Sequence, residues 1–472
     1  MTALDETETF YFSAAKLVEL YKLKNLSPVE VANDVLGRIQ TVNKFVNAFV
    51  KINEETAIIE ARESEKRWVA GEPSGLLDGV PITIKDLLIT KGSVTGRGSK
   101  ATVNLAPETE DAPCVKNLRK NGVVFIGRTT TPEFGWKGVT DSPLTGITRT
   151  PWNTNKTPGG SSGGAAVAAA LGMGALHIGT DGGGSVRIPA GFTGVFGLKP
   201  TASRIAVYPP SPFGTLSHVG PITRTVEDGA LMMNVMALPD MRDWFALPPD
   251  NFDYRRGLSD LKTGLRIAYS EDLGYAKVDP EVAALVKKSV KVFEDLGAQV
   301  DQEDPGFDEP IECFNKIWYW GCHKMLAAYP KETWAEMDPG LLEIAEIGAR
   351  YSLAVYSQAI DDREKLGQFM NMFHENYDLL LTPALAVPAF DVGLEHPEPG
   401  PGKRWAEWTP FSYPFNLTGQ PAAVVPCGFT RAGLPVGLQI VGRRYSDSLV
   451  MQAASAFEKI HPFLMPIAPI EG

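Results

Sequence analysis

Two clusters of glycine and serine hold the residues of this sequence that are best suited to chemistry. The first spans residues 157–164 with the sequence TPGGSSGG, and the second spans residues 179–189 with the sequence GTDGGGSVRIP. Glycines at this density let the backbone turn sharply and let another group approach it closely. Each cluster precedes a predicted helix, whose first N–H groups have no partner within the helix. Such N–H groups bind phosphate or stabilise the oxyanion that develops during acyl transfer.

We first compare the sequence with the known motifs of nucleotide-binding and metal-binding sites. A P-loop requires GxxxxGK[ST], and no Gly-Lys-Ser or Gly-Lys-Thr occurs near either cluster. A dinucleotide fingerprint requires GxGxxG; Gly172 and Gly174 begin one, but His177 stands where the last glycine belongs. The chain also has no HxH, HExxH or Asp/His cluster. We therefore expect no nucleotide, no metal and no other cofactor.

A serine nucleophile with a lysine base fits these residues better. Residues 159–163 formally match the GxSxG elbow, but TNKTP precedes them where a strand belongs. A Ser-His-Asp triad remains an alternative only if a histidine that is distant in the sequence supplies the base. Lysine is the next candidate base, because burial lowers its pKa and leaves it neutral. Lys85 follows a predicted strand at 80–84, where α/β folds gather functional groups. An exposed lysine at a strand end is the alternative interpretation.

Taken together, these segments resemble the amidase signature family. The likeness runs from about residue 12 to 460 and is weakest between 240 and 375. Six segments carry it: GVPITIKD at 79–86, TPGGSSGG at 157–164, GTDGGGSVRIP at 179–189, GVFGLKPT at 194–201, NLTGQPA at 416–422 and GLPVGLQ at 433–439.

The resemblance implies a Ser–cis-Ser–Lys triad formed by Lys85, Ser161 and Ser185. Ser161 follows a cis peptide bond in the family, and Ser185 is the acylated serine. Neutral Lys85 would accept a proton from Ser161, which accepts one from Ser185, whose Oγ attacks the amide carbonyl. Ser161 would then protonate the leaving nitrogen, and water would hydrolyse the acyl-enzyme by the reverse relay.

The resemblance also implies roles for neighbouring residues. It places oxyanion donors on the backbone at Gly182, Gly183, Gly184 and Ser185. Many members have Thr or Ile at the position of Gly182, so we expect a looser loop with an intact backbone donor. Ser162, Asp181 and Arg187 are expected to support the loop and the lysine. The match at 130–136 makes Phe134, Gly135 and Trp136 candidates for the substrate pocket, with core packing as the alternative for both aromatic residues.

The elements that must position these residues alternate along the chain. Strands are predicted at 48–52, 80–84, 123–126, 175–178, 265–269, 377–381, 422–426 and 437–441, and helices at 13–24, 53–69, 112–120, 164–171, 281–296 and 446–460. The alternation predicts an α/β fold, and the resemblance makes it a central mixed, twisted β-sheet covered by helices on both faces. We expect one domain over 1–472, with a signature core at about 75–205.

Two further segments look like insertions in this domain. Residues 304–367 are predicted to be helical and are rich in aromatic residues, so we expect them to shape the substrate pocket. Residues 393–408 are rich in Pro, Gly and Glu and predict a surface loop.

The composition narrows the remaining choices. The 472 residues carry a net charge of −11, which argues against general binding to nucleic acid or to an anionic membrane. No segment approaches the roughly 18 apolar residues of a membrane span, and the first residues do not read as a secretory signal. Four scattered cysteines indicate neither a disulfide framework nor a zinc ribbon. We expect a cytoplasmic protein.

The sequence therefore predicts a hydrolase that cleaves a small-molecule amide, such as an aryl or apolar amide, an anilide or a carbamate. One alternative is the glutamine-hydrolysing component of a tRNA-dependent amidotransferase, although SLAVYSQ at 352–358 departs from the Tyr-Tyr-x-Lys-Ala-Gln-like helix of such components. Another is a catalytically silent binding protein on the same fold. A homodimer is left open.

Overall fold

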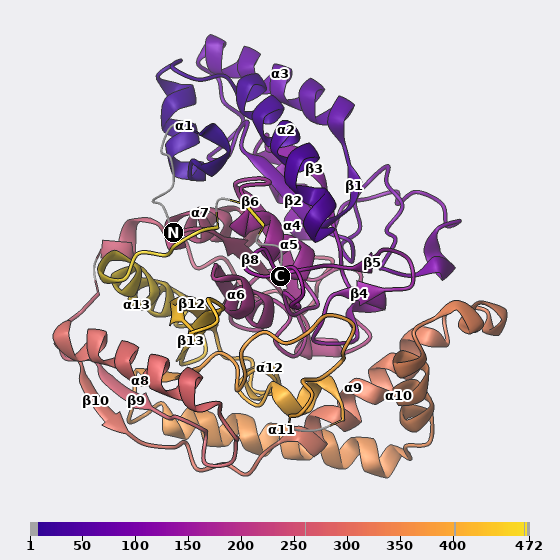
Figure 1. The fold of residues 1–472 in the computed structure, drawn as a ribbon, viewed down its shortest axis with the longest axis vertical. Coiled ribbons are helices and arrows are strands. Elements are labelled where there is room, and N and C mark those ends of the chain that lie inside the picture. The colour runs from indigo at the N-terminus through magenta and orange to yellow at the C-terminus, as the bar shows by residue number, and fades with distance from the viewer. Residues whose placement is uncertain (1–7, 260, 401–402, 467, 470–472) are drawn as a thin grey trace.

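One large mixed sheet runs through the computed structural model, which describes residues 8–259, 261–400, 403–466 and 468–469 (Figure 1). Its strands lie in the order β1 (Phe49–Ile52), β3 (Val124–Thr129), β2 (Pro81–Lys85), β6 (Leu176–Asp181), β8 (His218–Thr223), β7 (Phe196–Lys199), β12 (Ala422–Phe429), β13 (Pro435–Gly442), β11 (Leu379–Pro383), β9 (Arg266–Tyr269) and β10 (Gln299–Gln302). A small hairpin joins β4 (Asp141–Ser142) to β5 (Gly146–Ile147).

Parallel pairing places the predicted functional strands next to each other inside the sheet. Strand β2 pairs in parallel with β3 on one side and with β6 on the other. Because the carboxyl ends of parallel strands meet at one edge, the ends of β2 and β6 at Lys85 and Asp181 lie close together. Strand β6 pairs antiparallel with β8, and β12 with both β7 and β13, so the sheet is mixed as predicted.

Alternating residues of the strands enter two different hydrophobic cores. In β11, Leu379 and Leu381 belong to one cluster of buried side chains, whereas Leu380 between them belongs to the other. In β12, Ala423 and Val425 face the first cluster and Val424 faces the second. Successive side chains of a strand point to opposite faces, so both faces of the sheet are covered, as predicted.

Thirteen α-helices of the described residues surround the sheet. They are α1 (Ala14–Lys22), α2 (Pro28–Val46), α3 (Glu54–Ala70), α4 (Pro113–Lys120), α5 (Gly163–Ala170), α6 (Arg187–Thr193), α7 (Val226–Met236), α8 (Pro280–Asp295), α9 (Ile311–Leu326), α10 (Pro339–Ala349), α11 (Leu353–Phe373), α12 (Pro414–Leu417) and α13 (Asp447–Ile460). In Figure 1, α1 to α3 lie at one end of the molecule, and α9 to α11 lie at the other.

The two apparent insertions differ from one another in the structure. The segment 304–367 is helical as predicted, and α10 and α11 each pack on α9. The prediction of a surface loop at 393–408 is wrong for the end of that segment, because the residues Trp405 and Trp408 are only 3% and 0% exposed to solvent. These indoles pack on the aromatic rings of the second core, and this burial outweighs the loop-forming composition around them.

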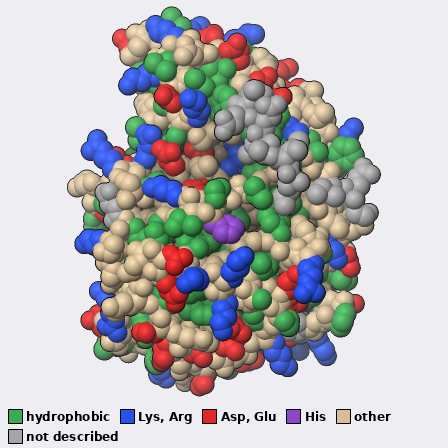
Figure 2. All heavy atoms as spheres, turned by 60° about the vertical axis from the view of Figure 1, so that its left-hand side comes forward, with side chains coloured by type: hydrophobic (Ala, Val, Ile, Leu, Met, Phe, Trp, Pro, Cys, Tyr) green, Lys and Arg blue, Asp and Glu red, His purple; other side chains and the backbone are tan. Residues whose placement is uncertain are grey.

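The outer surface is mixed in charge. On the face shown in Figure 2, Lys and Arg side chains are interspersed with Asp and Glu, and hydrophobic groups lie between them. No helix among the described residues combines the length and the apolar character needed to cross a bilayer. All four cysteines are buried and free.

Candidate active site

Strand β2 delivers Lys85 into the interior. The side chain is fully buried, so the alternative of an exposed strand-end lysine is wrong. Its Nζ atom lies 2.6 Å from Ser161 Oγ, 2.9 Å from Ser162 Oγ and 2.9 Å from Thr180 Oγ1. A neutral amine has two N–H donors and one lone pair, and a hydroxyl can donate or accept. Three hydroxyl groups therefore satisfy a neutral lysine fully without requiring a carboxylate.

Burial decides the charge of this lysine. Desolvation lowers the pKa of Lys85 well below its usual value, and the nearby Asp181 carboxylate offsets only part of that effect. No carboxylate hydrogen-bonds to Nζ among the described residues. The neutral form is therefore favoured, which is the form that can act as a general base.

The first glycine-serine cluster leads into α5 and places its two serines differently. The peptide bond between Gly160 and Ser161 is cis, as the resemblance implied. Ser161 lines a cavity, whereas Ser162 turns into the protein, where its hydroxyl donates to the carbonyl of Thr180 at 3.1 Å. The Ser162 N–H also donates to the carbonyl of Ser185 at 3.1 Å. Ser162 thus joins the two glycine-serine clusters.

The second cluster forms the turn between β6 and α6. The N–H of Gly184 donates to Asp181 Oδ1 at 2.8 Å, so the expectation that Gly184 is an oxyanion donor is wrong. The carboxylate holds this N–H because it stabilises the start of the turn, where N–H groups lack backbone partners. Among the described residues, the N–H groups of Gly182, Gly183 and Ser185 have no acceptor. These three groups are the ones available to an oxyanion.

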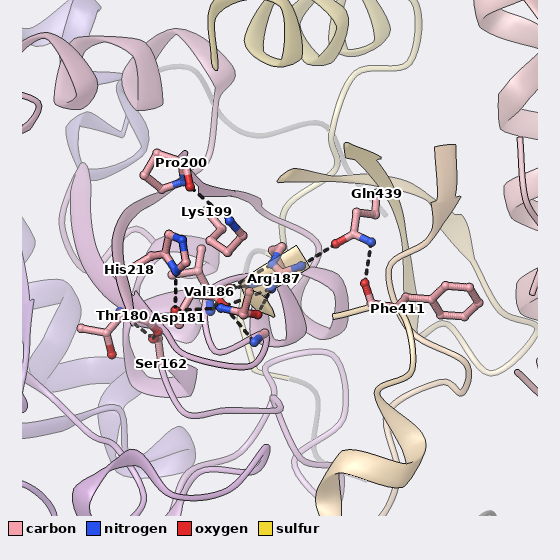
Figure 3. Close-up of polar contacts among 12 residues, drawn as sticks. Ser162, Thr180, Asp181, Val186, Arg187, Lys199, Pro200, His218, Phe411 and Gln439 are labelled. Carbon is pink, nitrogen blue, oxygen red and sulfur yellow. Dashed lines mark hydrogen bonds and ion pairs between the residues drawn. The ribbon is translucent and has the colours of Figure 1, made fainter. Parts of the chain in front are cut away.

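A buried ion pair holds that turn in place (Figure 3). Arg187 Nε and Nη2 each lie 3.0 Å from a carboxylate oxygen of Asp181, and both side chains are fully buried. Burial raises the pKa of Asp181, but the charge and hydrogen bonds of Arg187 outweigh it and keep the pKa below its ordinary value. A buried charge is stable only when it is paired in this way.

Amide side chains from distant strands and helices complete this support. Arg187 also donates to Gln439 at 2.9 Å and to Asn416 at 2.6 Å. Asn416 donates in turn to the carboxylate of Asp181 at 2.8 Å. Gln439 donates to the carbonyl of Phe411 at 2.8 Å (Figure 3). Sequence reasoning gave neither amide a role, although both lie in segments that carry the family resemblance. Their contacts with Arg187 are formed only by the fold.

A cavity of about 250 Å³ opens above these groups. Ser161, Ser185 and Gly182 line it together, and so do Phe134 and Gly135. No hydrogen bond joins Ser161 and Ser185 directly among the described residues, but both face the same space.

Trp136 follows the core-packing alternative, and Thr180 is a residue to which sequence reasoning gave no role. Trp136 was grouped with Phe134 and Gly135 in the sequence, but it is 1% exposed and is not among the described residues that line the cavity. Its carbonyl accepts a hydrogen bond from the indole of Trp318. Thr180 contacts the lysine, and sequence reasoning missed it because a threonine at a strand end has no distinctive pattern.

Histidine does not supply the base in this arrangement. His218 lines the cavity, but its Nδ1 lies 2.8 Å from the carbonyl of Leu216, and no histidine contacts Ser161 or Ser185 among the described residues. Burial first, and then the positive charge of Lys199, lower the pKa of His218 well below its ordinary value. No group of three or more metal-ligating side chains occurs in the part of the chain that the structure describes.

A buried amine between hydroxyl groups, a serine in a cavity and free backbone N–H groups are the parts of an acyl-transfer site. The amidase family model matches residues 30–451, and the chain belongs to that family of amide-hydrolysing enzymes. It is 38% identical over 471 residues to an acylamidase from Rhodococcus erythropolis, covering 98% of both chains. It is 32% identical to the A component of the glutamyl-tRNA(Gln) amidotransferase of Alkaliphilus metalliredigens, covering 93% of this chain and 94% of the other.

The fold also resembles that of solved structures in the family. The crystal structure of a bacterial aryl acylamidase of the amidase signature family superposes with a TM-score of 0.90 at 31% identity, covering 96% of each chain. The predicted fold is thereby confirmed, together with the prediction that the protein is an amide hydrolase.

Proposed function

We propose that the protein hydrolyses amides through an acyl-enzyme on Ser185, with Lys85 as the base and Ser161 as the proton carrier between them. The contact of 2.6 Å between Lys85 Nζ and Ser161 Oγ carries this proposal, because it gives the neutral amine a proton path toward the cavity. Ser185 Oγ attacks the carbonyl carbon, and its proton passes to Ser161 as the proton of Ser161 passes to Lys85.

The remaining steps use the same groups in reverse. The oxyanion accepts hydrogen bonds from the N–H groups of Gly182, Gly183 and Ser185, and one such donor is worth roughly 3–4 kcal/mol in related chemistry. Ser161 then protonates the nitrogen and takes back a proton from Lys85, the C–N bond breaks and the amine leaves. Water attacks the ester carbon and gives a proton to Ser161, which again passes its own proton to Lys85. When the intermediate collapses, the proton returns through Ser161 to Ser185, and the carboxylic acid and free Ser185 are released.

The cavity favours an uncharged, apolar substrate. Aromatic and proline side chains form much of its lining, including Phe134, Phe213 and Tyr329. Arg97 is the only Lys, Arg, Asp or Glu among its described lining residues, and Glu108 lies 3.3 Å from its guanidinium. We infer an aryl or apolar amide, an anilide or a carbamate as the substrate class, since such a lining gains energy from apolar groups.

The same lining disfavours free glutamine, the substrate of the amidotransferase alternative. Glutamine brings an ammonium and a carboxylate group, which need charged partners when they leave water. The only formal charge among the described lining residues is already paired. The segment 352–358, which corresponds to the helix expected to hold glutamine, lies outside the cavity lining.

A substrate panel tests the proposed function. We expect the isolated chain to cleave p-nitroanilides, apolar primary amides or carbamates and to leave glutamine unchanged. Release of p-nitroaniline is followed by absorbance, and ammonia release is followed for the primary amides and glutamine. Cleavage of glutamine alone, and only when partner proteins are added, would establish the amidotransferase function instead. No turnover with any substrate, and no acylated serine, would support the silent binding protein.

A further inference from the structure

Gly182 leaves room for a tryptophan ring beside the oxyanion donors. A Cβ atom at this position would lie 2.9 Å from Cζ3 and 3.1 Å from Cη2 of Trp318. The first distance is shorter than real Cβ contacts allow, so any larger residue at 182 must displace the indole. The loop that was expected to be loose is therefore packed against a ring edge.

Two contacts hold that indole in one orientation. Its ring stacks on Phe213 with centroids 3.9 Å apart and planes 10° apart. Its Nε1–H donates to the carbonyl of Trp136 at 3.1 Å. Trp318, Phe213 and Gly182 all line the catalytic cavity, although Trp318 is only 2% exposed. The atoms of the indole nearest to a Cβ at Gly182, Cζ3 and Cη2, belong to the edge of the ring, and both residues line the cavity.

A second glycine, Gly321, leaves room for the Phe213 ring that stacks on Trp318. Gly321 lies one turn after Trp318 in α9, and a Cβ there would lie 2.3 Å from the ring of Phe213. Helix α9 therefore presents a large ring and a gap at neighbouring positions on one face. The two glycines come from separate parts of the chain, and each admits one of the two stacked rings.

We propose that Gly182 and Trp318 form a specificity-determining pair that selects substrates with an aromatic ring close to the scissile amide. This inference rests on the amide hydrolysis proposed above. The edge of an aromatic ring is positive and attracts the negative face of a second ring. A saturated ring of similar size offers no such face. The expected advantage of the aromatic substrate is about two- to tenfold in kcat/KM.

Matched substrates and variants test the pair. Benzamide with cyclohexanecarboxamide tests a ring on the acyl side, and acetanilide with N-cyclohexylacetamide tests a ring on the amine side. Dividing each variant's aromatic-to-saturated ratio of kcat/KM by that of the unmodified enzyme cancels the intrinsic reactivity of the substrates. We expect Trp318→Leu to lower this ratio about two- to tenfold on one side. Trp320→Leu, on the same helix but outside the cavity lining, should leave the ratio unchanged.

A double-mutant cycle tests the packing itself. Gly182→Thr should lower kcat/KM for all four substrates, because the new side chain meets Trp318. In the double variant that also carries Trp318→Ala, kcat/KM for the saturated substrates should be at least tenfold higher than in Gly182→Thr alone. The preference for aromatic substrates should not return. Such a recovery is a coupling that independent sites do not show. Thermal melting of each variant separates loss of fold from loss of selectivity.

Two results would overturn the pair. One is an unchanged aromatic-to-saturated ratio in folded Trp318→Leu on both sides of the amide. The other is an additive effect of Gly182→Thr and Trp318→Ala. Failure of the unmodified enzyme to cleave any of the four substrates or the p-nitroanilides would instead overturn the hydrolase proposal on which the pair rests.

Discussion

At the scale of single residues, the proposed mechanism depends on a lysine that has no hydrogen-bonded carboxylate among the described residues to hold its proton. Lys85 is surrounded by the hydroxyls of Ser161, Ser162 and Thr180. Lys137 shows the contrast, because it lies 2.5 Å from Asp141 and 2.8 Å from Asp338. Burial lowers the pKa of Lys137, but these two carboxylates outweigh it and raise the pKa above its usual value. The hydrogen-bond partners of the two buried lysines thus explain why the pKa of Lys85 falls and that of Lys137 rises.

Replacing the lysine tests its role as the base. We expect Lys85→Met to lower kcat by about a thousandfold or more, as loss of the base does in other serine hydrolases. Thermal melting should show a folded protein, since methionine fills a similar volume. Retention of more than about a tenth of the activity in a folded variant would rule out Lys85 as the base.

The pH dependence of catalysis follows from the same lysine. The base works only when neutral, and burial lowers the pKa of Lys85 well below its usual 10.5. We therefore expect kcat/KM to rise with pH and to reach its plateau well below pH 10.5. The measurement is kcat/KM on a neutral anilide across the pH range from mildly acidic to strongly alkaline. A rate that still increases up to pH 10.5 would mean that the lysine is charged at neutral pH.

At the scale of elements, local pattern predicted most of the strands and helices near the site. The β-branched segment before Lys85 gave β2, and the alanine-rich segment after Gly163 gave α5. Strands β7 and β8 were not predicted. Strand β7 is short, and β8 contains Gly220 and Pro221, two residue types that are rare in strands. Their pairing within the sheet stabilises them, and such long-range contacts leave no local pattern.

Close packing of helices in the segment 304–367 gives a prediction at this scale. A Cβ at Gly348 in α10 would lie 2.1 Å from the backbone oxygen of Tyr319 in α9. We expect Gly348→Ala to destabilise the protein by about 1–3 kcal/mol through overpacking. Gly367→Ala in α11 is the matched control, since a Cβ there meets nothing within 4 Å. It should be stabilising by about 0.5–1 kcal/mol. Chemical unfolding measures both, and equal effects would contradict the packing.

At the scale of the whole molecule, the site depends on contacts between residues far apart in the chain. Arg187 joins the turn after β6 to Asn416 and Gln439, which lie more than two hundred residues later. The motifs and the family resemblance together predicted that Lys85, Ser161 and Ser185 are neighbours. They could not show that Asp181 takes the N–H of Gly184, because that bond depends on the path of the folded turn.

A second long-range contact gives a prediction for stability. Glu458 in α13 accepts hydrogen bonds from the N–H of Val226 at the start of α7, at 3.1 and 3.2 Å. Burial raises the pKa of Glu458 to about 7, with the negative charge of Asp228 adding to the effect. Between about pH 4.5 and 7 the folded state then holds a proton that the unfolded state has lost, so stability falls as pH rises.

Replacing Glu458 by a residue that does not titrate should make the stability of the protein less dependent on pH. We expect Glu458→Gln to raise Tm by about 2–4 °C at about pH 8 and to change it little at about pH 4.5, where the glutamate is already protonated. Calorimetry at the two pH values measures the difference, with the exposed Glu55→Gln as the control. A lower Tm at the alkaline pH would show that the charged form of Glu458 is the stabilising one.

The most direct test of the central claim is labelling with a fluorophosphonate followed by mass spectrometry. The reagent phosphonylates a serine whose hydroxyl is activated by a base. We predict one rapid adduct on Ser185, and labelling slowed by about a thousandfold in Lys85→Met. An adduct on Ser161 in place of Ser185, or labelling of Ser185 at an unchanged rate without the lysine, would contradict the proposed relay.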